Sequence, residues 1–201
     1  MSSPLFSDDI LFFQRLLCAD GYYKGKLDGS WGPKTEKAVS QFESKTAEIK
    51  AATRSFDIRS ENCICTLSVK AQQEARLFLG RVQDGGFNAR IISGTRTYEQ
   101  QNALFKQGRF GNPGPVITKA RGGQSNHNFG VAWDIGIFTS KGGYLADGKE
   151  YDQVAKLGQS ALIEWGGSWK SFPDRPHYQL MLGKSTSELR VAYEEGTIRY
   201  A

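Results

Sequence analysis

Apolar residues recur at helical spacing in two stretches near the start of the chain. The first predicted helix covers residues 7 to 17, where Ser7 is a suitable N-cap and acidic residues occupy the first turn. A second helix is expected from Pro33, a residue that suits the first helical position. The glycine-rich, aromatic segment 21–32 joins them as a loop. The pattern predicts a compact helix–loop–helix unit with apolar positions Ile10, Phe13, Leu17, Ala38, Val39 and Phe42.

After residue 66, apolar residues recur with the spacing of a helix in some stretches and with the spacing of a strand in others. Apolar residues between 67 and 82 trace one helical face, which Gly85 and Gly86 end. Thr97 and Gln100 have the spacing of a capping box, so a helix is expected from Thr97 to Lys106. Three strands are expected at 89–93, 131–137 and 177–180, and a further helix through Val154, Leu157, Ala161 and Leu162.

Two stretches lack such periodicity. Few apolar residues occur around 49–65, which we interpret as a linker between a helical domain in residues 1–48 and a second domain in residues 66–201. Residues 107 to 126 are rich in glycine and proline. A long loop inside a compact domain is usually functional, so this one is expected near a site.

Composition narrows the classes of partner. With 39% hydrophobic residues the chain suits a packed globular protein, and its net charge of +5 indicates an anionic partner such as nucleic acid, a lipid surface or an acidic envelope polymer. Charge alone does not choose among them. The N-terminus lacks the pattern of a secretory signal, and no apolar stretch reaches the roughly 18 residues of a membrane span. Cys18, Cys63 and Cys65 are expected to be reduced thiols.

The chain contains only two histidines, His127 and His177. His127 enters the predicted strand that carries Asp134, so an imidazole and a carboxylate can meet at a strand end. Two nitrogen ligands and one oxygen ligand suit a catalytic zinc, whose fourth position holds water. Asp174, three residues before His177, could act as a general base, although an aspartate beside Arg175 can also be a solvated ion pair.

The N-terminal pattern resembles the peptidoglycan-binding module found beside cell-wall hydrolases. The resemblance covers about the first 45 residues, and the alternative is a helical hairpin with no ligand of its own. Its motifs are Phe13-Gln14, Leu16-Leu17, Gly21-Tyr22-Tyr23, Asp28-Gly29 and Trp31-Gly32-Pro33-Lys34-Thr35.

The second region resembles the D-alanyl-D-alanine carboxypeptidase and L-alanyl-D-glutamate endopeptidase family of zinc enzymes. Three separated motifs occur in the family's order between residues 66 and about 182. They are Ser93-Gly94-Thr95-Arg96-Thr97-Tyr98, then Ser125-x-His127-x-x-Gly130-x-Ala132-x-Asp134, then Trp165-Gly166-Gly167-x-Trp169 through Asp174-Arg175-Pro176-His177.

This resemblance implies an α+β fold of the Hedgehog and D-alanyl-D-alanine metallopeptidase type, with a small antiparallel sheet, flanking helices and a small all-α domain before it. It also implies a Zn²⁺ cofactor. The resemblance assigns His127, Asp134 and His177 as zinc ligands, Asp174 as general base, Arg96 as donor to the substrate carbonyl, and Ser125 and Gln101 as residues near the substrate. For Ser125 and Gln101 the alternative is a structural role, in which they only form hydrogen bonds within the loop and the helix.

The segment from Trp165 to Tyr178 is more similar to lysis endopeptidases than to resistance D,D-peptidases. It therefore favours cleavage between L-alanine and D-glutamate of the stem peptide. Removal of a terminal D-alanine is the alternative within the same chemistry. A wall-binding protein with a non-catalytic zinc is an alternative of another class, and a basic nucleic-acid binder is a third, for which no recognised motif is present.

The implied partner is peptidoglycan, bound by a monomer that has no nucleic-acid ligand and no stable membrane anchor. A protein synthesised in the cytoplasm without a signal would reach the periplasmic wall after release by lysis or through a secretion device. A lysin would act with a holin-type partner and a delivered toxin with an immunity partner. The sequence shows neither.

Overall fold

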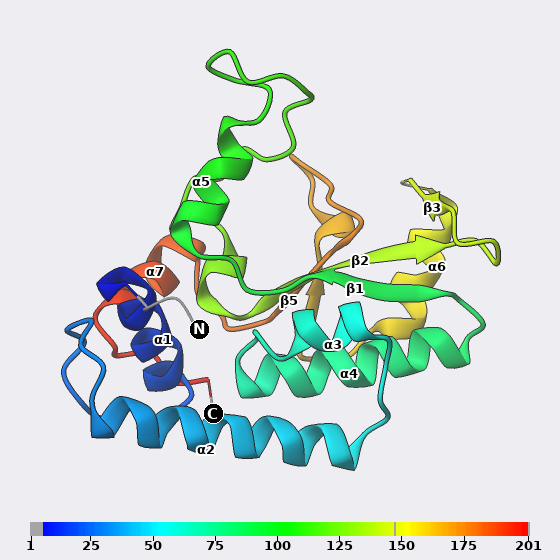
Figure 1. Ribbon diagram of the computed structural model, residues 1–201. Helices are drawn as coiled ribbons and strands as arrows, with labels where there is room; N and C mark the ends of the chain where they lie inside the picture. Colours follow the sequence, from blue (N-terminus) through cyan, green and yellow to red (C-terminus); the bar gives the residue numbers. More distant parts are fainter. Residues whose placement is uncertain (1–5, 147, 201) are drawn as a thin grey trace. The chain divides into compact units, whose positions relative to one another are not determined.

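The computed structural model describes residues 6–146 and 148–200 (Figure 1). Residues 1–5, part of the stretch in which no secretory signal is expected, lie outside the described residues. The chain forms two compact units. The helical unit comprises the chain up to Ala47, Arg96–Phe129 and the segment from Lys184 onward; the sheet unit comprises Glu48–Thr95 and Gly130–Gly183. The domain limits expected from the sequence stay a prediction.

The helical unit confirms the helices expected near the N-terminus and after Thr97. Ser7 is the first residue of its helix and not the N-cap; Phe6 takes that position, and the Asp9 carboxylate accepts the Phe6 N–H (3.2 Å). Thr97 does cap its helix and forms the expected capping box with Gln100. The elements are α1 (Ser7–Ala19), α2 (Pro33–Ala52, of which the part up to Ala47 belongs here), α5 (Tyr98–Lys106), the 3₁₀ helix η1 (Asn126–Phe129) and α7 (Thr186–Glu194).

A buried glutamine organises the loop between α1 and α2. Gln14 is fully buried, and its Oε1 atom accepts the N–H groups of Asp28 and Gly29, both at 3.0 Å. Its Nε2 atom donates to the Ser30 carbonyl (3.0 Å). One side chain thereby satisfies loop backbone groups that no helix or strand satisfies. The adjoining apolar cluster is Leu17, Cys18, Tyr23 and Ala38, with Tyr22, Leu27, Val39 and Phe42 against it.

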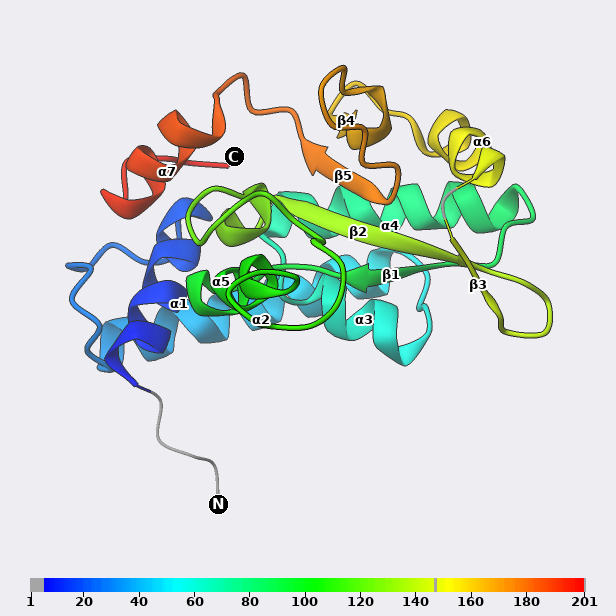
Figure 2. The same cartoon turned by 90° about the horizontal axis from the view of Figure 1, so that it is seen from above.

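The sheet unit is built on a small antiparallel sheet of order β1-β2-β5-β4, with β3 paired to β2. This sheet, its flanking helices and the helical N-terminal region confirm the α+β fold class. Figures 1 and 2 show α4 running alongside the sheet. The elements are α3 (Ile58–Ile64), α4 (Val69–Asp84), β1 (Ala89–Ser93), β2 (Ala132–Phe138), β3 (Tyr144–Leu145), α6 (Lys149–Gly158), β4 (Ile163–Trp165), the 3₁₀ helix η2 (Gly166–Ser168) and β5 (His177–Leu180).

The three expected strands are confirmed, but the helix expected through Leu162 is shorter. It ends at Gly158, whose carbonyl accepts a hydrogen bond from Arg81 (2.7 Å), so Ala161 and Leu162 lie outside it. A helix, α3, also occupies Ile58–Ile64 inside the expected linker, capped by the Asp57 side chain. Among the helices of the described residues, none is both long and apolar enough to cross a membrane. All three cysteines are free.

An aromatic core fixes one face of the sheet. The rings of Trp133 on β2 and Tyr178 on β5 stack with centroids 6.3 Å apart, and Phe78 of α4 lies 4.3 Å from Tyr178. All three side chains are almost fully buried. Because side chains alternate between the faces of a strand, the neighbours Asp134 and His177 project from the opposite face.

Candidate active site

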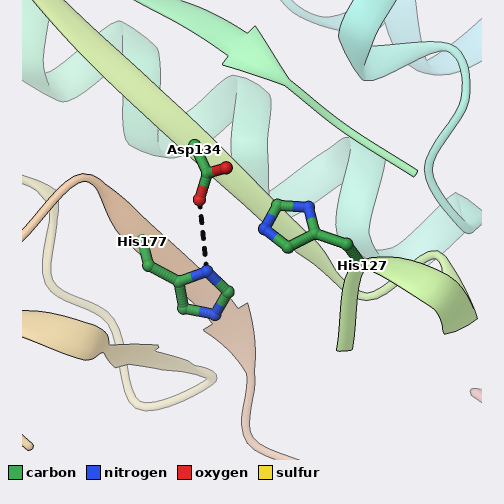
Figure 3. A group of neighbouring side chains, drawn as sticks. All are labelled: His127, Asp134 and His177. Carbon is green, nitrogen blue, oxygen red and sulfur yellow. Dashed lines mark hydrogen bonds and ion pairs between the residues drawn. The ribbon is translucent and has the colours of Figure 1, made fainter. Parts of the chain in front are cut away.

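His127, Asp134 and His177 lie together, as Figure 3 shows. Each offers one potential ligand atom, and these atoms all lie within 4.8 Å of one another. Both histidines are buried, with 2% of His127 and 6% of His177 exposed. The structure thus brings together the three residues that the sequence analysis singled out as zinc ligands.

Strand register places Asp134 beside His177. The two residues are direct partners in the antiparallel pairing of β2 with β5, so their side chains emerge from the same face. The His177 Nδ1 atom lies 3.2 Å from Asp134 Oδ1 (Figure 3). Trp133 and Tyr178 form the adjacent residue pair of the same two strands. Their stacked rings, on the face of the sheet that packs into the core, stabilise this register.

A hydrogen-bonded chain fixes the orientation of the His177 ring. Glu164 can only accept when ionised, and it accepts from Trp169 Nε1 (2.7 Å) and from Gln179 Nε2 (2.8 Å). The other end of the Gln179 amide, Oε1, therefore faces His177 Nε2 at 3.0 Å and requires a proton there. In the neutral ring this leaves the Nδ1 lone pair on the side of Asp134, available to a metal.

The surroundings of His177 attract positive charge. Burial by itself lowers the pKa of this imidazole, but the hydrogen bond and charge of Asp134, the bond to Gln179 and the charge of Asp174 raise it, and the net pKa is above the usual value. An environment that stabilises a proton on an imidazole also favours a divalent cation beside it, and the two compete.

His127 is positioned by its neighbour Asn128, which the sequence analysis did not single out. Asn128 is fully buried; its side chain donates to the Arg96 carbonyl (2.9 Å) and accepts the Gly123 N–H (3.0 Å). The Arg96 N–H in turn donates to the His127 carbonyl (3.0 Å). Ser125, half-buried, accepts the Asn128 N–H through its own carbonyl (2.9 Å). These bonds tie the segment of His127 to that of Arg96. The asparagine directly after His127 is the one feature of the sequence that could have indicated this supporting role.

Arg96 is held by Gln101. A guanidinium nitrogen of Arg96 donates to Gln101 Oε1 at 2.8 Å. The Gln101 side chain is fully buried, and its Nε2 atom donates to the Ala120 carbonyl (3.0 Å) in the long glycine-rich loop. Gln101 therefore contacts Arg96 and the loop; a contact of its own with substrate stays a prediction.

Asp174 lies in a tight turn before β5. Its N–H donates to the Gly166 carbonyl (3.0 Å), and its carbonyl accepts the His177 N–H (3.2 Å). A Cβ atom on Gly166 would lie 2.6 Å from the Asp174 carbonyl oxygen and 3.1 Å from the His177 Cβ, so only glycine fits. The adjacent Arg175 pairs with Asp152 (2.9 Å). The turn holds Asp174 three residues from the histidine whose pKa its charge raises.

The donor set fits a zinc ion. Two imidazoles and one carboxylate are the ligand types that a catalytic zinc uses, with a further position left to water. Gln179, which is half-buried and faces His177 Nε2, is the kind of hydrogen-bonded partner that orients a metal-binding imidazole. Roles for Asp174, Arg96, Ser125 and Gln101 in catalysis or substrate binding stay predictions.

Comparison with known proteins agrees with this arrangement. A family model described as D-alanyl-D-alanine carboxypeptidase matches residues 118–180, and one described as a putative peptidoglycan binding domain matches residues 7–46. The Bacillus subtilis (strain 168) protein named peptidoglycan L-alanyl-D-glutamate endopeptidase CwlK is 33% identical over 120 residues, which cover 55% of this chain and 71% of that protein.

A solved structure shares the fold. The crystal structure of the Serratia marcescens L-Ala D-Glu endopeptidase ChiX matches with a TM-score of 0.51 and 23% identity, and covers 67% of this chain and 95% of that one. The resemblance noted in the sequence is thereby confirmed. By its sequence relatives and its fold, the chain belongs to the D-alanyl-D-alanine carboxypeptidase family and is a metallopeptidase.

Proposed function

We propose that this protein is a zinc-dependent peptidoglycan hydrolase that cleaves the bond between L-alanine and D-glutamate of the stem peptide. The observation that carries the proposal is the His127, Asp134 and His177 cluster, whose ligand atoms lie within 4.8 Å of one another. The specificity rests on the relative CwlK, which is named for that bond. We take zinc as the metal because the donor set is the one that catalytic zinc sites use.

The side chains around the cluster have distinct tasks in this proposal. His127, Asp134 and His177 would hold the zinc, which supplies a Lewis acid and lowers the pKa of water. Asp174 would take a proton from the attacking water on a carboxylate oxygen and pass it to the leaving amine. Arg96, oriented by Gln101, would donate to the scissile carbonyl oxygen as negative charge develops there.

The matched segment 7–46 supports a division of labour, in which the N-terminal module binds the wall and the metal site cuts it. The net charge of +5 favours association with an anionic envelope polymer. Acting on the wall from a cytoplasmic site of synthesis would require release by lysis or delivery by a secretion device.

Removal of a terminal D-alanine is the second candidate, favoured by the description of the family model that matches residues 118–180. Mass spectrometry of purified peptidoglycan digested by the zinc-loaded protein separates the two. A new L-alanine carboxyl end supports the endopeptidase, whereas loss of a single D-alanine assigns the carboxypeptidase. The Asp174→Ala variant should release neither product. Normal binding to sacculi without any cleavage by the wild type would leave a non-catalytic wall-binding protein instead.

A further inference from the structure

The long loop between α5 and η1 (residues 107–125) has an uncharged tip with cationic residues on both sides. The tip, residues 110–118, contains no charged side chain. Lys106 and Arg109 precede it, and Lys119 and Arg121 follow it. Residues 100–133 contain these four cations and no aspartate or glutamate, so they account for four of the five net positive charges of the chain. The net charge of the protein is therefore concentrated in and beside one loop.

The tip exposes apolar side chains to solvent. Every residue from Phe110 to Ile117 is exposed, and the exposed fractions are 76% for Phe110, 51% for Val116 and 45% for Ile117. Figure 1 shows the loop projecting beyond the C-terminal end of α5. In the part of the chain that the structure describes, Phe110 is also the one non-glycine residue with a positive φ, 53°. The loop thus holds an aromatic side chain in solvent at a cost in backbone strain.

Two arginines order the base of the loop. The Nη1 atom of Arg109 donates to the carbonyls of Phe105 (2.6 Å) and Thr118 (2.9 Å), which lie on opposite sides of the tip. The guanidinium carbons of Arg109 and Arg121 lie 4.2 and 4.9 Å from the centroid of the Phe105 ring. These contacts close the loop across its base and leave both charges in place. A tip that is held in this way loses less conformational entropy on binding than a free segment does.

This arrangement favours an anionic lipid surface over other anionic partners. At a bilayer, apolar side chains enter the headgroup region while the cations around them reach the lipid phosphates. A hydrated acidic polymer, such as a nucleic acid, would pair with the cations but leave the apolar side chains uncovered. A protein partner would need a surface shaped to fit a projecting tip, whereas a bilayer needs no such complementarity and attracts each cation separately.

We propose that this loop docks the protein on a bilayer that contains anionic phospholipids, with the side chains of Phe110, Val116 and Ile117 in the headgroup region. The contact is peripheral and reversible, because three side chains bury far less apolar surface than a membrane-spanning helix. It goes beyond the proposed function, since it needs neither the metal site nor peptidoglycan. Docking of this kind would concentrate the protein at the membrane that the wall surrounds.

Co-sedimentation of the full chain with vesicles tests the proposal. Vesicles of equal parts phosphatidylglycerol and phosphatidylcholine should bind at least about 10-fold more tightly than pure phosphatidylcholine. Phe110→Asn should weaken binding about 10-fold. Asparagine adopts a positive φ more readily than phenylalanine, so this variant should unfold at the wild-type temperature or above it. Ile58→Asn replaces a similarly exposed apolar residue on α3 (81% exposed) and should bind like the wild type.

Two double variants of equal charge test whether the cations beside the tip matter. Lys106→Gln with Lys119→Gln should weaken binding about 25-fold, or about 5-fold for each charge lost near the bilayer. Lys24→Gln with Lys37→Gln removes the same charge from exposed positions outside the loop and should weaken binding less than about 3-fold. Polyglutamate at a charge concentration equal to that of the lipid should not displace the protein, because it offers no apolar layer.

Four outcomes would each overturn the proposal. They are equal losses in the two double variants, wild-type binding by Phe110→Asn, no preference for anionic vesicles, and displacement of the protein by polyglutamate. None of these measurements depends on hydrolysis, so failure of the lipid proposal and failure of the proposed function are seen separately.

Discussion

The guanidinium of Arg96 donates to the amide oxygen of Gln101 across 2.8 Å, and Gln101 is itself anchored to the Ala120 carbonyl (3.0 Å). A long, flexible side chain is thereby held in one orientation by a residue that is fully buried. Preorganised donors stabilise developing charge without reorganising during the reaction. The pairing explains how a loop residue just before α5 could serve as an oxyanion donor.

The first prediction concerns this pairing. Gln101→Ala should reduce kcat about 10- to 100-fold, because a misplaced catalytic group loses most of its advantage, while the Kd for zinc stays unchanged. Steady-state kinetics and a zinc titration measure the two quantities. Lys106→Ala, at an exposed position of the same helix, is the control and should leave both unchanged. A variant with normal kcat would show that Arg96 needs no support from Gln101.

A second prediction addresses the chain from Glu164 through Gln179 to His177. Gln179→Ala removes the acceptor that fixes the Nε2 proton, so zinc affinity should fall about 10- to 100-fold. Competition with a chelating dye measures it. Gln159→Ala, at an exposed position after α6, should have no effect. Equal zinc affinity in the wild type and Gln179→Ala would contradict a role for the chain in orienting His177.

The third prediction is a pH-dependent contribution to stability from Glu61. Burial by itself raises the pKa of Glu61, but hydrogen bonds from Arg76 and the Phe56 N–H, with the charge of Arg76, outweigh it and lower the net pKa below 4.5. A lowered folded-state pKa stabilises the protein above the unfolded value, and this stability is lost as the pH falls through the folded value. Acid should therefore weaken the link between α3 and α4.

Glu61→Gln measures that contribution. Because Arg76 is 2% exposed and would lose its countercharge, the free energy of unfolding at pH 7 should fall by about 3 kcal/mol. The difference from the wild type should shrink below about pH 4. Asp84→Asn removes the exposed partner of Arg54 and should cost less than about 1 kcal/mol. Urea unfolding at several pH values tests both, and a pH-independent difference would refute the electrostatic explanation.

The fourth prediction uses the close approach at Gly166. Gly166→Ala places a methyl group 2.6 Å from the Asp174 carbonyl oxygen, so the turn must shift and stability should fall by about 1–3 kcal/mol. Hydrolysis should fall as Asp174 and His177 move. Gly32→Ala, whose added Cβ would meet no atom within 4 Å, is the steric control. Thermal unfolding and activity of Gly166→Ala equal to the wild type would show that the turn tolerates a side chain.

Local features of the fold were predictable wherever short-range chemistry decides them. The Thr97 and Gln100 capping box, the end of α4 at Gly85 and the alternation along β2 depend on neighbours in sequence. The helix end at Gly158 coincides with a glycine, a local stop signal that the expectation of a helix through Leu162 did not use, whereas the bond from Arg81 of another helix to the Gly158 carbonyl is a tertiary contact. Helix α3 is only seven residues long in a polar stretch, and its Glu61 pairs with Arg76 of α4, a contact that the local pattern does not show.

The sequence by itself determined which residues carry the candidate chemistry: two histidines, one strand aspartate and the motifs around them, whose order does not depend on packing. Only the tertiary structure decided how these residues are supported. Strand register places Asp134 opposite His177, Gln179 and Glu164 set the proton on that ring, and Asn128 joins the segments of His127 and Arg96. His177 and Gln179 are neighbours on β5, but the bonds of Gln179 to Glu164 and of Asn128 to Arg96 link distant segments, so no local propensity encodes them; they form when the backbone folds and buried polar groups must find partners.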